Sequence, residues 1–370
     1  MIEPPYRQLT AEQDAVLMAP IDTRLIVQGG PGTGKTRMAV YRALLHSAAE
    51  DTAVVVVPGE LRRLQMVSVL GNRRSRIRVL TVHHLLELMV PEVVANHRPS
   101  DEGFWVEALI ALAKRQTRVV GAGWALVLDD AHDMPPGLHP LIALFAQRMA
   151  VFHDQSTVIS DRQTDEATLT ASYPAATHLP LSQGHRWTSQ IASLASELMP
   201  GRRLPGRSYV TGSGEPVLAV QMRSPAEVAV FVAELLRAAP RTRIAVACQS
   251  QQAFRGLSAH LRNTVGERRY TPVWPDLAMR PSQTAFMRQV LLIRRDLLQG
   301  LEFDVIIATE IDNRGQDVTG LDYRGPLYRT IAAARDRVVL TWSGPGGADR
   351  LISTLPSVDP IASRNRQMPE

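Results

Sequence analysis

A glycine-rich segment that carries one lysine is the part of the sequence best suited to chemistry. Residues 29–36 read Gly-Gly-Pro-Gly-Thr-Gly-Lys-Thr, which fits the pattern G-x-x-x-x-G-K-[ST] in full. The apolar run Leu25–Gln28 predicts a strand before it, and a helix is expected from Thr36, which is the context this pattern requires. Glycines let backbone N–H groups converge on phosphate oxygens, and a helix N-terminus adds the positive end of its dipole. The segment therefore predicts a binding site for a nucleoside triphosphate such as ATP.

Two residues of this loop have specific expected roles. Lys35 would reach the β and γ phosphates, and the Thr36 hydroxyl would hold Mg²⁺. The chain has 39 Arg and only two Lys. The compact lysine ammonium is a point charge that a planar guanidinium does not replace. The alternative, a glycine-rich turn with an incidental lysine, does not explain the flanking strand and helix. The residues assigned to the nucleotide are Gly30, Gly32, Thr33, Gly34, Lys35, Thr36 and Arg37.

Two adjacent carboxylates follow another apolar run. Residues Ala125–Asp129 predict a strand, and Asp130 comes directly after it. Asp129 is placed to bind the Mg²⁺ shell, and Asp130 to orient or deprotonate the attacking water. The alternative is a strand end with two solvated acids. We expect the catalytic pair, because this strand follows the phosphate loop in the order that the fold requires.

From Leu9 to about Leu340 the sequence resembles the superfamily 1 helicases of the UvrD/Rep/PcrA type, and its motifs come in the family's order. Residues 9–13, L-T-A-E-Q, resemble the family's Q motif, which implies that Gln13 reads the adenine edge. Residues 80–84, L-T-V-H-H, resemble the T-x-H motif, which implies that Thr81 and His83 touch single-stranded DNA.

The second half of the chain continues the resemblance. Residues 181–191 parallel the family's L-x-x-N-Y-R-S-x-x-x-I. This places Arg186 on the arginine that reaches the γ-phosphate, and His185 on the tyrosine that stacks on adenine. Residues 299–305, Q-G-L-E-F-D-V, match K-G-L-E-F-D-V at six of seven positions. The resemblance implies that Glu302, in the same loop as Gly300, contacts the ribose.

Three departures from the family's motifs concern hydrolysis. The expected glutamate is Asp130, one methylene shorter, and a misplacement of about an ångström can cost roughly 100-fold in rate. Ala333 stands where the family has a second γ-phosphate arginine, and such an arginine is worth about 10³ to 10⁵ in turnover. The G-D-x-x-Q switch is matched best at residues 160–163, one residue short, which makes Gln163 its candidate. Slow ATP turnover is therefore expected.

Features for binding nucleic acid are mixed. Aromatic residues are 5% of the chain, so few side chains are available for base stacking. The net charge of +5 allows an anionic partner without requiring one. Arg62 and Arg63 form a basic cluster that would track a phosphate backbone. A solvated arginine face in an arginine-rich chain explains them equally well, and both explanations stay open.

Apolar runs alternate with helical stretches along the chain. This alternation predicts an α/β protein with mainly parallel sheets covered by helices on both faces, and the resemblance implies two RecA-like P-loop NTPase domains. We expect an N-terminal ATP-binding domain over residues 1–181, a C-terminal domain over 182–348 and a mobile tail over 349–370. The expected strands are Leu25–Gln28, Ala53–Val57, Arg78–Thr81, Ala125–Asp129, Thr157–Ser160, His178–Leu181, Val217–Val220, Arg243–Cys248, Val290–Ile293, Asp304–Ala308 and Arg337–Thr341.

Composition narrows the class of protein. The longest apolar run is far short of the roughly 18 residues that a spanning helix needs, and the N-terminus lacks the basic and apolar segments of a signal peptide. The single cysteine, Cys248, excludes internal disulfides and multi-cysteine metal sites. We expect a soluble, cytoplasmic protein without a membrane partner.

We consider three hypotheses for the function. The first is a helicase or translocase core that hydrolyses ATP with Mg²⁺ on single-stranded DNA, with weak turnover. The second is a nucleotide-gated module that hydrolyses ATP poorly and signals to DNA or to a partner protein of a repair, replication or defence system. The third, a small-molecule kinase, does not account for the matches at Arg186 and Glu302.

Overall fold

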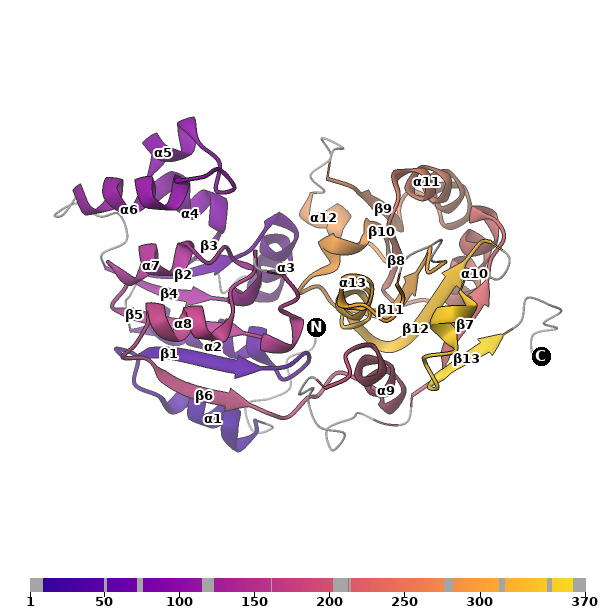
Figure 1. Cartoon of the computed structure of the whole chain (residues 1–370), viewed down its shortest axis with the longest axis horizontal. Helices are drawn as coiled ribbons and strands as arrows, with labels where there is room; N and C mark the ends of the chain where they lie inside the picture. The colour runs from indigo at the N-terminus through magenta and orange to yellow at the C-terminus, as the bar shows by residue number, and fades with distance from the viewer. Residues whose placement is uncertain are drawn as a thin grey trace. The chain divides into compact units, whose positions relative to one another are not determined.

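The chain divides into two compact units, Met1–Gly184 (unit 1) and His185–Glu370 (unit 2) (Figure 1). The boundary predicted after residue 181 falls at the end of the last strand of unit 1. The computed structural model describes residues 9–49, 52–71, 76–114, 123–160, 162–201, 212, 214–275, 282–312, 317–344 and 348–361.

Unit 1 is built on a six-stranded sheet in the order β3-β2-β4-β5-β1-β6. Every neighbouring pair of these strands is parallel. The strands are β1 (Arg24–Gly29), β2 (Thr52–Val57), β3 (Ile77–Thr81), β4 (Trp124–Leu128), β5 (Arg148–His153) and β6 (Thr177–Leu181). Parallel alignment puts the carboxyl ends of all six strands at one edge, which is where open α/β sheets bind ligands.

Helices cover both faces of this sheet, because successive strand residues point to opposite sides. Along β2, Val55 and Val57 join the buried cluster of one face, whereas Val54 and Val56 join the cluster of the other. The first face is covered by α1 (Ala11–Met18), α2 (Lys35–Ala48) and α3 (Glu60–Leu70). The second is covered by α4 (Val82–Met89), α5 (Pro91–Asn96), α6 (Phe104–Lys114), α7 (Leu138–Ala143) and α8 (Glu166–Ser172). A strand buried on both faces is an unbroken apolar run, which makes β2 visible in the sequence.

One strand of unit 1 is not where the sequence pattern predicts it. The strand expected over Thr157–Ser160 is wrong, because Gln155–Thr157 forms a 3₁₀ turn. The strand between β4 and β1 is β5, which begins at Arg148, five residues after the end of α7. A short apolar run has no period that distinguishes a strand from the continuation of a helix, and the sequence pattern predicts a helix over Pro140–Arg148 that runs into the start of β5.

Unit 2 contains a second parallel sheet, which has seven strands among the described residues, in the order β13-β7-β12-β11-β8-β10-β9. The strands are β7 (Val217–Gln221), β8 (Ile244–Cys248), β9 (Tyr270–Val273), β10 (Val290–Arg294), β11 (Phe303–Ala308), β12 (Ala334–Trp342) and β13 (Val358–Ile361). The helices are α9 (Ser189–Leu198), α10 (Pro225–Ala238), α11 (Gln251–Val265), α12 (Gln283–Phe286), α13 (Leu321–Ile331) and α14 (Asp349–Ile352). Apolar residues of α10 and α11 share a buried cluster with β8, β10 and β11, and α9 packs with α13 against β12.

The C-terminal stretch has more structure than its sequence suggests. The mobile tail expected from residue 349 is wrong for residues 349–361, which contain α14 and β13. Backbone pairing between β13 and β7 extends the sheet, and Leu351 anchors α14 with 1% exposure. The elements here are only four residues each, which is too short to show a period. Residues 362–370 lie outside the described part.

The predicted α/β class, with parallel sheets flanked by helices, is confirmed in both units. Across the described ranges, no helix combines the length and the apolar character needed to cross a membrane.

His139 of α7 is buried between two hydroxyl groups. Its Nε2 lies 3.1 Å from Thr164 Oγ1, and its Nδ1 lies 3.1 Å from the Tyr173 hydroxyl. The Thr164 hydroxyl donates to the Met134 carbonyl at 2.7 Å, so its oxygen accepts from Nε2–H and the Tyr173 hydroxyl donates to Nδ1. Both bonds suit the neutral ring, and burial lowers the pKa of His139 to about 4.

The stability of unit 1 should therefore depend on the protonation of His139. The unfolded ring has a pKa of about 6.5, so its contribution is fully present above that pH and is lost as the pH falls toward the folded pKa. The loss corresponds to roughly 3 kcal/mol of unfolding free energy between neutral pH and about pH 4. Urea unfolding of the wild type and His139→Gln at both pH values measures it, and the variant should show a pH dependence smaller by about this amount. The same pH dependence in both proteins would contradict the assignment.

Candidate nucleotide-binding site

The carboxyl edge of the first sheet gathers most of the predicted nucleotide-site residues of unit 1. The glycine-rich loop follows β1, and Asp129 with Asp130 follows β4. Asp154 follows β5, the strand that lies between β4 and β1 in the sheet. Neighbouring parallel strands end at the same edge, so these segments meet although they are far apart in the sequence.

The loop has the backbone geometry expected for binding an anion. Gly32 and Gly34 have φ angles of 76° and 91°, in the left-handed region that glycine adopts readily. Gly34 is the N-cap of α2, and no side chain accepts a hydrogen bond at this cap. The Thr33 hydroxyl donates to the Gly30 carbonyl at 2.9 Å, which closes the loop. The first N–H groups of α2 thus lack a side-chain acceptor, and this is the arrangement that binds phosphate at a helix N-terminus.

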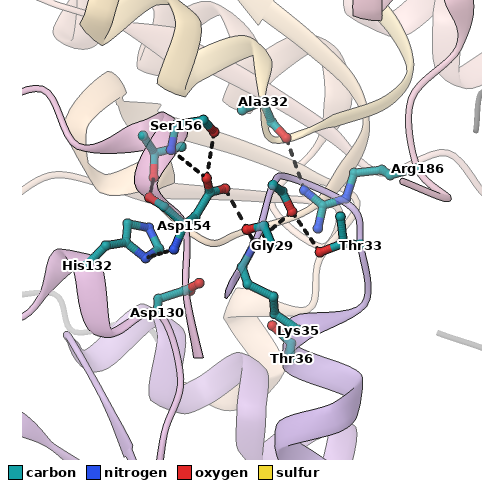
Figure 2. Close-up of polar contacts among 12 residues, drawn as sticks. Gly29, Thr33, Lys35, Thr36, Asp130, His132, Asp154, Ser156, Arg186 and Ala332 are labelled. Carbon is teal, nitrogen blue, oxygen red and sulfur yellow. Dashed lines mark hydrogen bonds and ion pairs between the residues drawn. The ribbon is translucent and has the colours of Figure 1, made fainter. Parts of the chain in front are cut away.

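Lys35 lies along this loop with 7% exposure. Its Nζ donates to the Gly29 carbonyl at 2.8 Å and to the Gly30 carbonyl at 2.7 Å, and it lies 3.4 Å from Asp154 Oδ2 (Figure 2). Asp154 is itself fixed, because its Oδ1 accepts a hydrogen bond from Ser156 N–H at 2.9 Å. The ammonium is therefore held at the glycine-rich loop by two carbonyls and one carboxylate.

Asp154 is a site residue that the sequence interpretation misses. It follows the apolar run of β5 in the way that Asp129 follows β4, and this acid after a short strand is the signal that could have identified it. Gln163, the residue predicted for the G-D-x-x-Q switch, lies further along the chain. Its Nε2 donates to Asp133 Oδ1 at 2.8 Å and to the Thr157 carbonyl at 3.2 Å, so it stabilises the loop after β5.

Asp129 and Asp130 are both buried, with exposures of 0% and 6%. Burial raises the pKa of Asp129 to about 6, even with Arg62 beside it. Burial acts in the same direction on Asp130, but the charges of Arg62 and His132 outweigh it, and the pKa of Asp130 lies below its usual value. Asp130 also has φ 57° and ψ 46°, a left-handed conformation that is uncommon for a residue other than glycine.

Arg62, in the first turn of α3, connects both carboxylates to the phosphate loop. Its Nε donates to Asp130 Oδ2 at 2.6 Å, and its Nη2 donates to Asp129 Oδ2 at 2.9 Å. The same Nη2 donates to Thr36 Oγ1 at 2.6 Å, and Nη1 donates to Gln65. The side chain is 6% exposed. This corrects the prediction that Arg62 binds nucleic acid, because its guanidinium is buried in an ion-pair network.

The side chains predicted to hold Mg²⁺ lie close together, but both already accept a hydrogen bond from an arginine. Thr36 Oγ1 and Asp129 Oδ1 are 3.3 Å apart, close to the roughly 3 Å expected between neighbouring oxygens of a six-coordinate Mg²⁺ with ligands at about 2.1 Å. Both side chains, however, accept a hydrogen bond from Arg62 Nη2. The residues in this arrangement do not fit Mg²⁺, because a guanidinium nitrogen lies against both of its expected ligands.

Gln13 and Arg37 border the same loop. Gln13 Nε2 donates to the Thr33 carbonyl at 3.1 Å, and its Oε1 accepts from Thr10 N–H at 3.3 Å. The guanidinium of Arg37 lies over the Tyr41 ring, 5.9 Å from its centroid. Two of its nitrogens, Nε and Nη2, are buried without a hydrogen-bond acceptor in the described part of the chain. Gln13 therefore supports the loop, and Arg37 has donors left for an anionic ligand.

The remaining nucleic-acid candidates differ in their exposure. Thr81 is buried, and its hydroxyl caps the N-terminus of α4. Arg63 is half-buried and donates two hydrogen bonds to the Glu60 carboxylate, at 2.8 and 2.7 Å. The side chain of His83 is 60% exposed, with its Nε2 3.3 Å from Glu87. Of these three side chains, that of His83 is the most exposed to solvent.

The candidates of unit 2 form a second cluster. Arg186 donates to the Ala332 carbonyl at 3.0 Å (Figure 2). It also donates to the Glu302 carboxylate. Arg335 Nη2 lies 3.2 Å from the other oxygen of Glu302. The two residues that the resemblance assigns to the γ-phosphate and the ribose are thus an ion pair within unit 2.

Other predicted residues flank this pair. His185 is exposed and directly precedes Arg186. Gly300 has a φ of 70°, a left-handed turn that leads into β11. Ala333 is 3% exposed, and its carbonyl accepts from Phe303 N–H at 2.9 Å. Ala333 brings no charge to the cluster, whereas Arg335, two residues later, does.

Comparisons with known proteins identify the fold. No protein-family model matches the sequence, and no curated protein matches it. The structure of S. cerevisiae Dbp5 bound to RNA and ADP BeF3 has a TM-score of 0.57 and 13% identity, over 96% of this chain and 90% of that chain. A variant of S. cerevisiae Dbp5 bound to Nup159, a Gle1 variant, IP6 and ADP has a TM-score of 0.51 and 12% identity, over 97% of this chain and 92% of that chain. The Escherichia coli DEAH/RHA helicase HrpB has a TM-score of 0.48 and 13% identity, over 92% of this chain and 44% of that chain. The chain has the tandem RecA-like fold found in helicases.

Removing the charge of Arg62 should strongly destabilise unit 1. Arg62→Gln leaves two buried carboxylates without their cation, which typically costs about 3–5 kcal/mol. Arg63→Gln is the matched control, because it removes the neighbouring arginine from a partly exposed pair with Glu60 and should cost less than about 1 kcal/mol. Urea unfolding in EDTA measures both. Equal losses for the two variants would contradict the network described for Arg62.

Proposed function

We propose that this protein is an ATP-binding, helicase-like protein that acts on single-stranded DNA and turns ATP over slowly. The observation that carries the proposal is the geometry at Lys35. A buried ammonium lies on a loop with two left-handed glycines, directly before an uncapped helix N-terminus. The tandem RecA-like fold supports the same class of function.

The roles proposed for individual residues follow from this geometry. Backbone N–H groups of residues 32–36 and the Lys35 ammonium bind the phosphates, which displace the carbonyl and carboxylate contacts that now hold Lys35. The free donors of Arg37 add a second cation near the start of α2. The resemblance to UvrD-type helicases supplies the roles of Arg186 for the γ-phosphate and of Glu302 for the ribose.

A second candidate function is a nucleotide-gated module that binds ATP and hydrolyses it poorly. One observation favours it: Asp130, the carboxylate expected to orient or deprotonate water, accepts a hydrogen bond from Arg62 Nε at 2.6 Å. A carboxylate held in an ion pair is a weaker base, because its pKa is lowered. Position 333 is an alanine where the family has a second γ-phosphate arginine, and this also lowers the expected rate of hydrolysis. On this function, closure around ATP would signal to a partner protein or to DNA.

Loss of Lys35 should weaken ATP binding. Lys35→Ala removes the only side-chain cation that contacts the loop carbonyls among the described residues, and we expect affinity for a fluorescent ATP analogue to fall by at least about tenfold. Lys114→Ala is the matched control, since it removes the other lysine of the chain, which is exposed at the end of α6. Equal binding by Lys35→Ala and Lys114→Ala would overturn the proposed site.

Turnover distinguishes the two candidate functions. We expect the wild type to hydrolyse ATP well below the roughly 10 per second that is typical of enzymes. Stimulation by a single-stranded DNA oligonucleotide, lost in Lys35→Ala, supports the translocase. Tight ATP binding without turnover, with hydrolysis restored by Asp130→Glu combined with Ala333→Arg, supports the switch. Turnover near ~10² per second would contradict the slow hydrolysis proposed here, and stimulation by RNA alone would contradict the DNA substrate.

A further inference from the structure

The guanidinium of Arg62 lies where a P-loop protein is expected to bind a divalent cation. In such proteins the cation contacts the hydroxyl after the loop lysine and the carboxylate at the end of a neighbouring strand. Here these groups are Thr36 and Asp129, and Arg62 Nη2 lies 2.6 Å from the first and 2.9 Å from the second. A single nitrogen therefore bridges the two expected ligands.

The guanidinium of Arg62 and a metal ion would compete for the side chains of Thr36 and Asp129. A Mg²⁺ ion requires oxygen ligands at about 2.0–2.1 Å. Thr36 Oγ1 and Asp129 Oδ2 both accept a hydrogen bond from Arg62 Nη2. An ion bound to either atom would therefore have to displace the guanidinium or lie beside its positive charge. Either the guanidinium or the metal can hold these two oxygens. Because both carboxylates are buried, a cation beside them offsets the cost of keeping them charged.

Arg62 is fixed at this position by more than the two shared contacts. Its Nε donates to Asp130 and its Nη1 donates to Gln65, one turn along α3. It lies at the third position of α3, which starts directly after β2 and the turn at Gly59. Arg63, the next residue, points to Glu60 and is 29% exposed. The difference between these neighbours shows that the buried position of Arg62 is specific and not a general property of the cluster.

We propose that Arg62 is the resident cation of this site, so that the protein binds nucleoside phosphates without a divalent metal. The inference rests on the proposed nucleotide binding at the loop of Lys35. The ligand class it assigns is a metal-free nucleoside di- or triphosphate, whose phosphates are bound by Lys35 and the backbone N–H groups of the loop, while Arg62 pairs with Asp129 and Asp130. Guanidinium groups suit this role because they pair with phosphate and carboxylate oxygens in a fixed planar geometry.

The first test measures metal binding directly, without nucleotide. Mn²⁺ is titrated into the protein, and free Mn²⁺ is followed by electron paramagnetic resonance. The wild type and the control Arg63→Gln should retain no Mn²⁺ at the loop, whereas Arg62→Gln should gain one site, because Thr36 and Asp129 are then open. Addition of Mn²⁺ should also raise the melting temperature of Arg62→Gln and leave that of the wild type unchanged. Tight binding of Mn²⁺ by the wild type, abolished by Asp129→Asn, would overturn the inference.

The second test compares nucleotide affinity with and without metal. A fluorescent ATP analogue is titrated into each protein in excess EDTA and in excess MgCl₂. For the wild type and Arg63→Gln the two affinities should agree within about threefold, and for Arg62→Gln the affinity should be at least about tenfold higher in MgCl₂. A wild type that binds about tenfold more tightly in MgCl₂ would overturn the inference while leaving the proposed function intact.

The Mn²⁺ titration and the nucleotide titration together distinguish failure of the inference from failure of the proposed function. Absence of saturable binding in both EDTA and MgCl₂ would reject the proposed nucleotide site, and the Mn²⁺ titration would still decide whether Arg62 excludes a metal. If Arg62→Gln does not fold, the comparison of EDTA with MgCl₂ for the wild type decides the question alone.

Discussion

Two buried carboxylates at the end of β4 impose the main constraint on unit 1. Asp129 and Asp130 are almost fully buried, and an unpaired buried carboxylate carries a desolvation penalty of several kcal/mol. The fold meets this constraint with Arg62, which reaches both acids from the start of α3. The same guanidinium contacts Thr36, at the start of α2. One side chain thus joins the segments that follow β1, β2 and β4, and connects the start of α2 to both carboxylates.

The parts of this site that depend on local sequence were predictable. The loop at residues 29–36 and the acids after β4 are short segments whose spacing reflects their own backbone geometry, and the structure places them as a strand, a loop and a helix N-terminus. Asp154 could have been found in the same way, but the strand before it has no distinctive period. The α/β class followed from apolar runs long enough to be buried on both faces.

The role of Arg62 could not be read from the sequence. The contact with Asp130 joins residues 68 positions apart, and it exists because β2 lies beside β4 in the sheet. In a chain with 39 arginines, nothing in the residue type separates a buried arginine from a solvated one. Arg186 and Glu302 differ from Arg62 in this respect. They are 116 positions apart, but the motifs of the resemblance identify both as site residues. Local patterns identify strands and loops, whereas pairing between loops is a property of the fold.

The claim that Arg62 replaces a metal at a functioning phosphate loop is tested most directly by crystallography. Crystals of the protein with a non-hydrolysable ATP analogue, grown with Mn²⁺, would be measured at the manganese absorption edge. The account predicts phosphates along the loop at Lys35, Arg62 Nη2 still between Thr36 and Asp129, and no anomalous peak at that point. A manganese peak bound by Thr36 and Asp129, with the guanidinium turned away, would contradict it.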